Sequence, residues 1–344
     1  MSRREHPLIL LEKISTHLKL GPILTEPTAL SGGLLHKIFR LQTTSGTYAI
    51  KLLNPNILSR PEARQNFIDS ERIATALQSE VAAVAAMPFQ GSTLQQIGSD
   101  AYLVFPWTEG IILTVQQIKP QHAQHIGQQL AQIHQANLSF SVQQTADSVH
   151  VPVSWDTFDD HIRQQGLEIL EPFVIALDHI KRWEREASLA IAQLAGATVL
   201  SHRDLDAKNV LWNSDAPTII DWESAGPIHP MHDFIETALY WSLDENNQFQ
   251  PTHFEAFTKG YFSTGAKLYF PIEPALSAGY AGKLGWLAYS LSKAFQLEPV
   301  NAQQQQVAVQ QVLETLTSLK DYETLCPVIR VWWQNHLANT SRSI

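Results

Sequence analysis

The sequence predicts an α+β protein in which a small antiparallel sheet precedes a mainly helical part. Apolar residues alternate along residues 25–53, and Ser45 and Gly46 supply a turn between the last two strands of this stretch. From Pro61 the apolar residues recur at helical spacing, and after Asp233 the chain again has this spacing.

Length and composition indicate a protein of two domains or lobes. The chain has 344 residues, of which 44% are hydrophobic, so it is long enough to bury a large core. Its single cysteine, Cys326, excludes a disulfide framework and a cysteine metal site. At the start of the chain, Glu12 and Lys13 interrupt the apolar residues, which predicts an amphipathic helix and not a signal peptide. No stretch approaches the ~20 apolar residues that cross a bilayer, so we expect a cytoplasmic protein without a membrane partner.

Acidic residues are concentrated in the second part of the chain. Residues 1–106 carry 10 Lys or Arg against 8 Asp or Glu, whereas residues 107–344 carry 14 against 25. This excess argues against nucleic acid as a partner and favours a cationic small molecule. Ordinary surface charge for solubility explains the excess equally well.

Residues 199–233 carry the chemistry that the sequence predicts. Asp204 follows His202 in the pattern H-R-D-x-x-x-x-N, which ends at Asn209, and Asp221 closes a predicted hairpin. In phosphoryl transfer one carboxylate orients the attacking hydroxyl, while an amide and a second carboxylate hold Mg²⁺. We therefore expect Asp204 to be catalytic and Asn209 and Asp221 to bind the metal. The alternative is a hairpin whose acidic residues only form turns.

Three segments in this order, HRDLDAKN, IIDWE and PMHDF, resemble those of the aminoglycoside phosphotransferase and choline kinase-like family. The resemblance covers roughly residues 20 to 300. It implies a protein-kinase-like bilobal fold with a nucleotide-binding lobe (residues 1–105) and a catalytic and acceptor-binding lobe (residues 106–344). It also implies that the protein moves the γ-phosphate of ATP, with Mg²⁺, to a hydroxyl of a small molecule. Arg203 is a departure, because many small-molecule kinases have glycine at this position.

In the first lobe, Lys51 ends the strand TYAIKLL and matches the lysine of the V-A-I-K strand, which contacts the α- and β-phosphates. Such a lysine needs a glutamate on the following helix to keep it aimed. Glu71 is preferred because it lies beside the apolar stripe of that helix. Glu62 lies in the first turn, where an acid more often stabilises the helix dipole.

Two further nucleotide contacts follow from the resemblance. Ser31, Gly32 and Gly33 lie where a kinase loop covers the phosphates, although a plain hairpin would use these glycines equally well. The linker between the lobes implies that the Phe105 carbonyl and the Trp107 amide contact adenine. The proline between them cannot donate a hydrogen bond.

Four polar residues near the motif have open roles. Lys208 is expected either to neutralise the transferred phosphate or to be an ordinary surface lysine. Asp206 and Glu223 either face the acceptor or cap the loop. Asp233 is expected to bond to the backbone or to Arg203 and so to hold the loop in place.

Away from the motif, His134 is expected to be structural. We also considered five acidic residues that would meet an amine on the acceptor: Asp156, Asp159, Asp160, Asp244 and Glu245.

The favoured function is therefore ATP-dependent phosphorylation of a small-molecule acceptor that carries an amine. A protein kinase is an alternative, but Asp221 is followed by WE in place of FG, and the eleven residues before Asp233 leave no room for an activation loop. An inactive nucleotide-binding regulator is a second alternative, which the intact Asp204, Asn209 and Asp221 disfavour. The sequence leaves open the acceptor (an aminoglycoside, an amino alcohol or a sugar), the choice between ATP and GTP, and the oligomeric state.

Overall fold

The computed structural model describes residues 5–30, 36–136, 138, 152–165, 168–268, 271–297 and 300–341. Its first part contains a five-stranded antiparallel sheet, which confirms the predicted α+β class. The strands are β1 (Thr28–Leu30), β2 (Lys37–Thr43), β3 (Gly46–Leu52), β4 (Gln95–Ile97) and β5 (Asp100–Pro106), in the order β1-β2-β3-β5-β4. The predicted turn is present, because Thr43 pairs with Gly46 where β2 meets β3.

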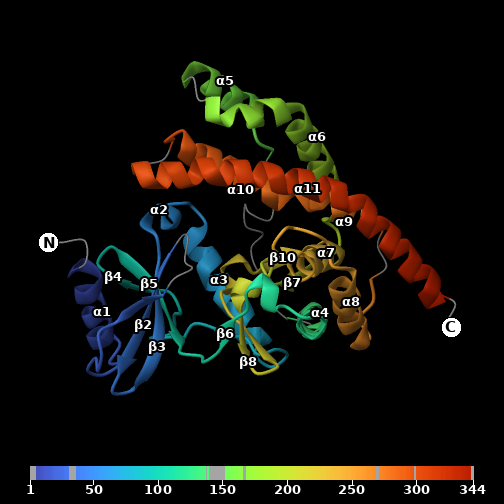
Figure 1. Ribbon diagram of the computed structural model, residues 1–344. Coiled ribbons are helices and arrows are strands. Elements are labelled where there is room, and N and C mark those ends of the chain that lie inside the picture. Colours follow the sequence, from blue (N-terminus) through green and yellow to red (C-terminus); the bar gives the residue numbers. More distant parts are fainter. Residues whose placement is uncertain are drawn as a thin grey trace.

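Helices cover both faces of this sheet (Figure 1). Side chains alternate along β5, so that Tyr102 and Val104 pack with α1 (Glu5–His17), while Ala101 and Leu103 join the cluster that contains Phe67 of α3 (Ala63–Leu77). The short helix α2 (Pro55–Leu58) precedes α3. Because Lys51 pairs with Leu103 across the ladder, it lies on the face of the sheet that α3 covers.

The rest of the chain is mainly helical. Its helices are α4 (Pro120–Gln135), α5 (Trp155–Gln165), α6 (Glu171–Leu194), α7 (Pro230–Tyr240), α8 (Pro251–Ser263), α9 (Ile272–Ala278), α10 (Tyr280–Ala294) and α11 (Ala302–Ser341). Two small sheets lie among them: β6 (Ile111–Ile112) with β8 (Val210–Asn213) and β9 (Ala216–Ile219), and β7 (Val199–Ser201) with β10 (Gly226–Ile228). The 3₁₀-helices are η1 (Val115–Gln117), η3 (Glu168–Leu170), η4 (Ala207–Asn209) and η5 (Trp222–Ser224). In Figure 1, α5, α6 and α10 lie above the five-stranded sheet, and the long helix α11 runs from there down past α8 at the right.

Two prolines lie within helices, although proline commonly breaks a helix. Pro172 lies in the first turn of α6, where the missing N–H of a proline removes no intrahelical bond. The last helix, α11, continues to Ser341 with Pro327 inside it. Its apolar residues, such as Ile329, are buried against the helical core, and tertiary packing therefore overrides the local preference to stop.

The sheet ends with β5, one residue beyond the predicted lobe boundary. We keep the division into residues 1–105 and 106–344 as a proposal. In the parts of the chain that the structure describes, no helix has both the length and the apolar character needed to cross a bilayer.

Helices α4 and α8 approach each other closely through two glycines. A Cβ atom at Gly127 would collide with the carbonyl oxygen of Phe257, and one at Gly260 would collide with the carbonyl oxygen of Gln124. Only a residue without a side chain fits at these positions. The contact brings together the two helices that carry His134 and Tyr261.

We predict that Gly127→Ala lowers the free energy of unfolding by about 1–3 kcal/mol, because the added methyl group forces the two helices apart. Urea unfolding measures this change. The matched control is Gly285→Ala in α10, where nothing lies within 4 Å of the new Cβ. This control should gain about 0.5–1 kcal/mol, since alanine is the better helix former. Equal stability of Gly127→Ala and the wild type would contradict the close packing.

Candidate active site

His202 ties the predicted catalytic loop to the strand that ends at Asp221. Its buried ring donates from Nε2 to the carbonyl oxygen of Ile220 (3.0 Å) and accepts the amide of Asp204 at Nδ1 (3.3 Å). The ring also packs edge-on against Trp222. Burial lowers the pKa of His202, which agrees with a neutral ring that has one donor and one acceptor. The two segments that carry the carboxylates are therefore held in one geometry.

Asp204 and Asn209 lie in direct contact. The side-chain amide of Asn209 donates to the backbone carbonyl of Asp204 (2.8 Å) and to its Oδ2 (2.9 Å). On the other side, Lys208 Nζ lies 3.2 Å from Oδ1 of Asp204 and 3.5 Å from Oδ2 of Asp206. Burial raises the pKa of Asp204, and the charge of Lys208 opposes this shift. Asp206 also accepts the amide of Ala207 and caps the short helix η4, one of the two roles that the sequence left open.

Lys51 reaches from the five-stranded sheet to the segment 221–223. Its Nζ lies 2.7 Å from Oδ1 of Asp221 and 2.5 Å from Oε2 of Glu223. Burial alone would lower the pKa of Lys51, but the two carboxylates outweigh it and raise the pKa. Lys51 is therefore charged and joins the sheet to the helical part.

The predicted ion pair between Lys51 and Glu71 is wrong. The carboxylate of Glu71 is buried and accepts the backbone amide of Ala86 at 2.6 Å. Burial raises the pKa of Glu71 to about 7, although the positive charge of Lys51 acts to lower it. The carboxylate of Glu71 is therefore hydrogen-bonded to the backbone, and Glu223 forms the ion pair with Lys51 that the sequence analysis expected of Glu71.

His36 is a residue of this network that the sequence analysis missed. Its Nε2 lies 3.3 Å from Oε2 of Glu223, and its Nδ1 accepts the amide of Asn54 at 3.0 Å. Burial favours a neutral Glu223, but the hydrogen bond from His36 and the charge of Lys51 dominate, so its pKa is lowered. A histidine fifteen residues before Lys51 gives no sequence signal for this contact.

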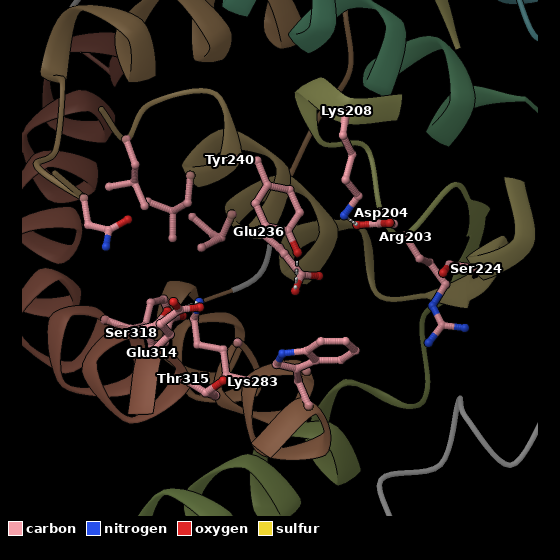
Figure 2. A pocket seen from close by; sticks show the side chains of 18 of the residues that line it. Arg203, Asp204, Lys208, Ser224, Glu236, Tyr240, Lys283, Glu314, Thr315 and Ser318 are labelled. Atoms are coloured by element: carbon pink, nitrogen blue, oxygen red, sulfur yellow. Dashed lines mark hydrogen bonds and ion pairs between the residues drawn. The ribbon is translucent and has the colours of Figure 1, made fainter. Parts of the chain in front are cut away.

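Two residues of the site have left-handed backbone conformations, Arg203 with φ 63° and Asp221 with φ 60°. Such angles cost a non-glycine residue about 1–2 kcal/mol. A glycine at position 203 would adopt this conformation without that cost. The side chain of Arg203 extends away from Asp204, toward the region of Ser224 (Figure 2).

Asp233 contacts His134, a partner that the sequence analysis did not name. His134 Nε2 lies 2.8 Å from Oδ2 of Asp233, and His134 Nδ1 lies 2.8 Å from the hydroxyl of Tyr261. Burial would raise the pKa of Asp233, but the hydrogen bond with His134 outweighs it and lowers the pKa. The contact joins α4, α7 and α8, in agreement with a structural role for His134.

The oxygen atoms of Asn209 and Asp221 fit a magnesium site. Asn209 uses its amide nitrogen for Asp204 and Asp221 uses Oδ1 for Lys51, which leaves one oxygen on each side chain. Mg²⁺ in kinases is commonly held by one or two protein side chains together with phosphate oxygens and waters. Within the described ranges, no group of three or more His, Cys, Asp or Glu residues is arranged to hold a metal.

The sequence profile of the phosphotransferase enzyme family matches residues 26–267, which include all of the residues placed above. The chain belongs to this family. It is an ATP-dependent small-molecule kinase, and the family resemblance that its motifs indicate is confirmed. No curated protein matches the sequence.

Solved structures share the protein-kinase-like fold of this phosphotransferase. A spectinomycin phosphotransferase in complex with ADP and spectinomycin is 16% identical, with a TM-score of 0.64 over 91% of this chain and 98% of that one. An ethanolamine kinase of Plasmodium vivax is 15% identical, with a TM-score of 0.58 over 88% and 85%. A choline/ethanolamine kinase family protein of Mesorhizobium loti is 16% identical, with a TM-score of 0.57 over 91% and 94%. At these identities the similarity establishes the predicted fold.

The linker after β5 differs from the prediction in its register. The amide of Trp107 already donates to the carbonyl of Thr47 (3.1 Å). Phe105 pairs with Ala49 two residues earlier in the same antiparallel ladder, where hydrogen-bonded pairs alternate with non-bonded ones. Phe105 therefore also faces β3, and neither predicted group is available to a base.

The neighbouring residues face the other way. The carbonyl of Val104 points away from β3 and accepts the amide of Met87 (2.7 Å). By the same alternation, the carbonyl of Pro106 points away from β3. The other predicted nucleotide contacts, Ser31, Gly32 and Gly33, lie outside the described residues.

A cavity of about 790 Å³ begins at Lys51 and Asp221, passes Asp204 and continues between α7 and the pair α10 and α11 (Figure 2). None of the five acidic residues considered from the sequence lines it. Asp156 and Asp159, for example, form ion pairs with Lys181 and Arg163. The acidic residues that line its far end are Glu236, Glu314 and Asp321.

We predict that the stability of the phosphotransferase falls with rising pH because of Glu71. Its folded pKa of about 7 exceeds its usual value of 4.5, so the folded state binds this proton more tightly than the unfolded state. The resulting stabilisation is complete below pH 4.5 and is lost as the pH rises through 7, a change of up to about 3 kcal/mol.

Glu71→Gln should remove this pH-dependent part of the free energy of unfolding. Urea unfolding at pH 5 and pH 8 should therefore show a smaller fall for the variant than for the wild type. Glu80→Gln, at an exposed position just after the same helix, is the control and should keep the wild-type slope. An unchanged slope in Glu71→Gln would contradict the assignment.

Proposed function

We propose that this phosphotransferase transfers the γ-phosphate of ATP to a hydroxyl group of a small, amine-bearing molecule through Asp204. The observation that carries the proposal is that Asp204, Asn209, Asp221 and Lys51 lie together, with three of them lining one cavity. The same cavity extends past Asp204 into a space with acidic walls, which suits an amine on the acceptor.

In this proposal Asp204 orients the acceptor hydroxyl and takes its proton as the new O–P bond forms. The contacts from Asn209 and Lys208 fix the direction of the Asp204 carboxylate. Asn209 and Asp221 would hold Mg²⁺, which neutralises negative charge on the phosphates. Lys51 grips the α- and β-phosphates, and Lys208 lies beside the path of the transferred group.

We also propose that the Pro106 carbonyl and the Thr108 amide bind adenine, in place of the neighbouring groups predicted from the sequence. The support is the direction of the Pro106 carbonyl, which points away from β3 at the end of the sheet, and Thr108 lies two residues further along the chain.

The direct test is phosphate transfer from γ-labelled ATP with Mg²⁺ to a panel of aminoglycosides, amino alcohols, amino acids and sugars. We predict transfer to at least one acceptor, and a kcat for Asp204→Asn about 10²–10⁴-fold lower, with the Kd for Mg·ATP unchanged. Tight Mg·ATP binding without transfer to any acceptor would favour an inactive regulator instead.

The adenine contact has its own test. Thr108→Pro removes the amide proton and should raise the KM for ATP about 2- to 10-fold, the usual effect of one lost hydrogen bond. Thr108→Ala keeps the amide and is the matched control. Equal KM values for both variants would place the adenine contact elsewhere.

A further inference from the structure

His36 joins the part of the chain with the five-stranded sheet to the helical part, beside the ion pairs of Lys51. It lies directly before β2, and its Nε2 lies 3.3 Å from Oε2 of Glu223 in the 3₁₀-helix η5. The same oxygen atom accepts from Nζ of Lys51. His36 also lines the cavity that begins at Lys51 and Asp221. Two side chains from the sheet-containing part therefore hold one oxygen of Glu223.

A backbone contact fixes which nitrogen of the His36 ring carries the proton. Nδ1 accepts the amide proton of Asn54 at 3.0 Å, so Nδ1 itself carries no proton. In a neutral imidazole the proton then lies on Nε2, the nitrogen that faces Glu223. His36 therefore donates a hydrogen bond to the Glu223 carboxylate.

The position of this ring is fixed by its surroundings. The side chain is only 3% exposed, and it packs edge-on against Phe67 of α3 with the ring centres 5.6 Å apart. Asn54, which holds Nδ1, is the cap of α2 and accepts the amide of Asn56 with its side chain. The ring is therefore anchored on two helices and presents its Nε2 proton at one place.

Glu223 needs this second donor because its contact with Lys51 is shared. Nζ of Lys51 pairs with both Asp221 and Glu223, and a phosphate group would compete for the same three ammonium protons. Burial acts to raise the pKa of Glu223, and the hydrogen bond from His36 is the largest of the effects that lower it. The proton of His36 therefore favours a charged carboxylate in one direction, independently of what Lys51 binds.

We propose that His36 is a positioning residue for nucleotide binding, because its Nε2 proton holds the Glu223 carboxylate that aims the ammonium group of Lys51. The proposal rests on the contact between Lys51 and the phosphates proposed above. It is independent of the identity of the acceptor. The competing explanation is that His36 only anchors Asn54 at the start of α2.

Two substitutions separate the roles of the two ring nitrogens. Asparagine places an oxygen near the position of Nδ1 and keeps an acceptor for Asn54, whereas glutamine places an amide donor near the position of Nε2. Calorimetry at neutral pH on the full-length protein measures the Kd for Mg·ATP. The Kd should rise about 5- to 10-fold in His36→Asn and stay within about twofold of the wild type in His36→Gln.

The matched control is His17→Asn, at an exposed position at the end of α1, which should bind Mg·ATP as the wild type does. Urea unfolding shows whether each variant is folded under the conditions of the assay. Wild-type affinity in His36→Asn, or equal losses of affinity in His36→Asn and His36→Gln, would overturn the proposal.

A double-mutant cycle tests whether His36 acts through Glu223. In the Glu223→Gln background, His36→Asn should change the Kd less than about twofold, because the carboxylate that it positions is absent. The full loss of affinity in that background would overturn the proposal. Wild-type affinity in Lys51→Met would instead contradict the phosphate contact of Lys51, on which the proposal rests.

Discussion

The ion pairs between Lys51 and the carboxylates of Asp221 and Glu223 are the interaction on which the active site depends. They join strand β3 to the segment that follows β9, more than 160 residues later in the chain. Burying a lysine without a partner is unfavourable, but two carboxylates pair with Lys51 and stabilise its charge. His36 in turn contacts the carboxylate of Glu223. Lys51 and Asp221, to which we assign nucleotide and metal binding, are therefore placed by one network.

The predicted catalytic loop is fixed by contacts to the segment before Asp221 and by contacts within the loop itself. His202 connects the loop to the strand of Asp221, while Asn209 holds both the backbone and the carboxylate of Asp204. Helices α4, α7 and α8 meet through His134, Asp233 and Tyr261, and this meeting depends on the close approach of α4 and α8 at their glycines. The left-handed conformation of Arg203 is tolerated because the surrounding contacts determine the loop.

The sequence predicts those parts of the site whose residues lie close together along the chain. Asp204 and Asn209 are five residues apart in one loop, and Lys51 ends a strand with clear alternation, so local patterns suffice to place them. The partner of Lys51 was mispredicted because the choice between Glu71 and Glu223 depends on the backbone amide of Ala86, a contact that no local pattern encodes. The sequence did not show that Phe105 and Trp107 face β3, because the direction of the backbone groups alternates along a strand and a shift of one residue reverses it.

The central claim is that Glu223, and not Glu71, keeps Lys51 aimed at the nucleotide. The most direct measurement is the Kd for Mg·ATP of Glu223→Gln and Glu71→Gln, by calorimetry at neutral pH. The account predicts binding about tenfold weaker, about 1.4 kcal/mol, for Glu223→Gln and within about threefold of the wild type for Glu71→Gln. Weak binding by Glu71→Gln together with wild-type binding by Glu223→Gln would contradict it.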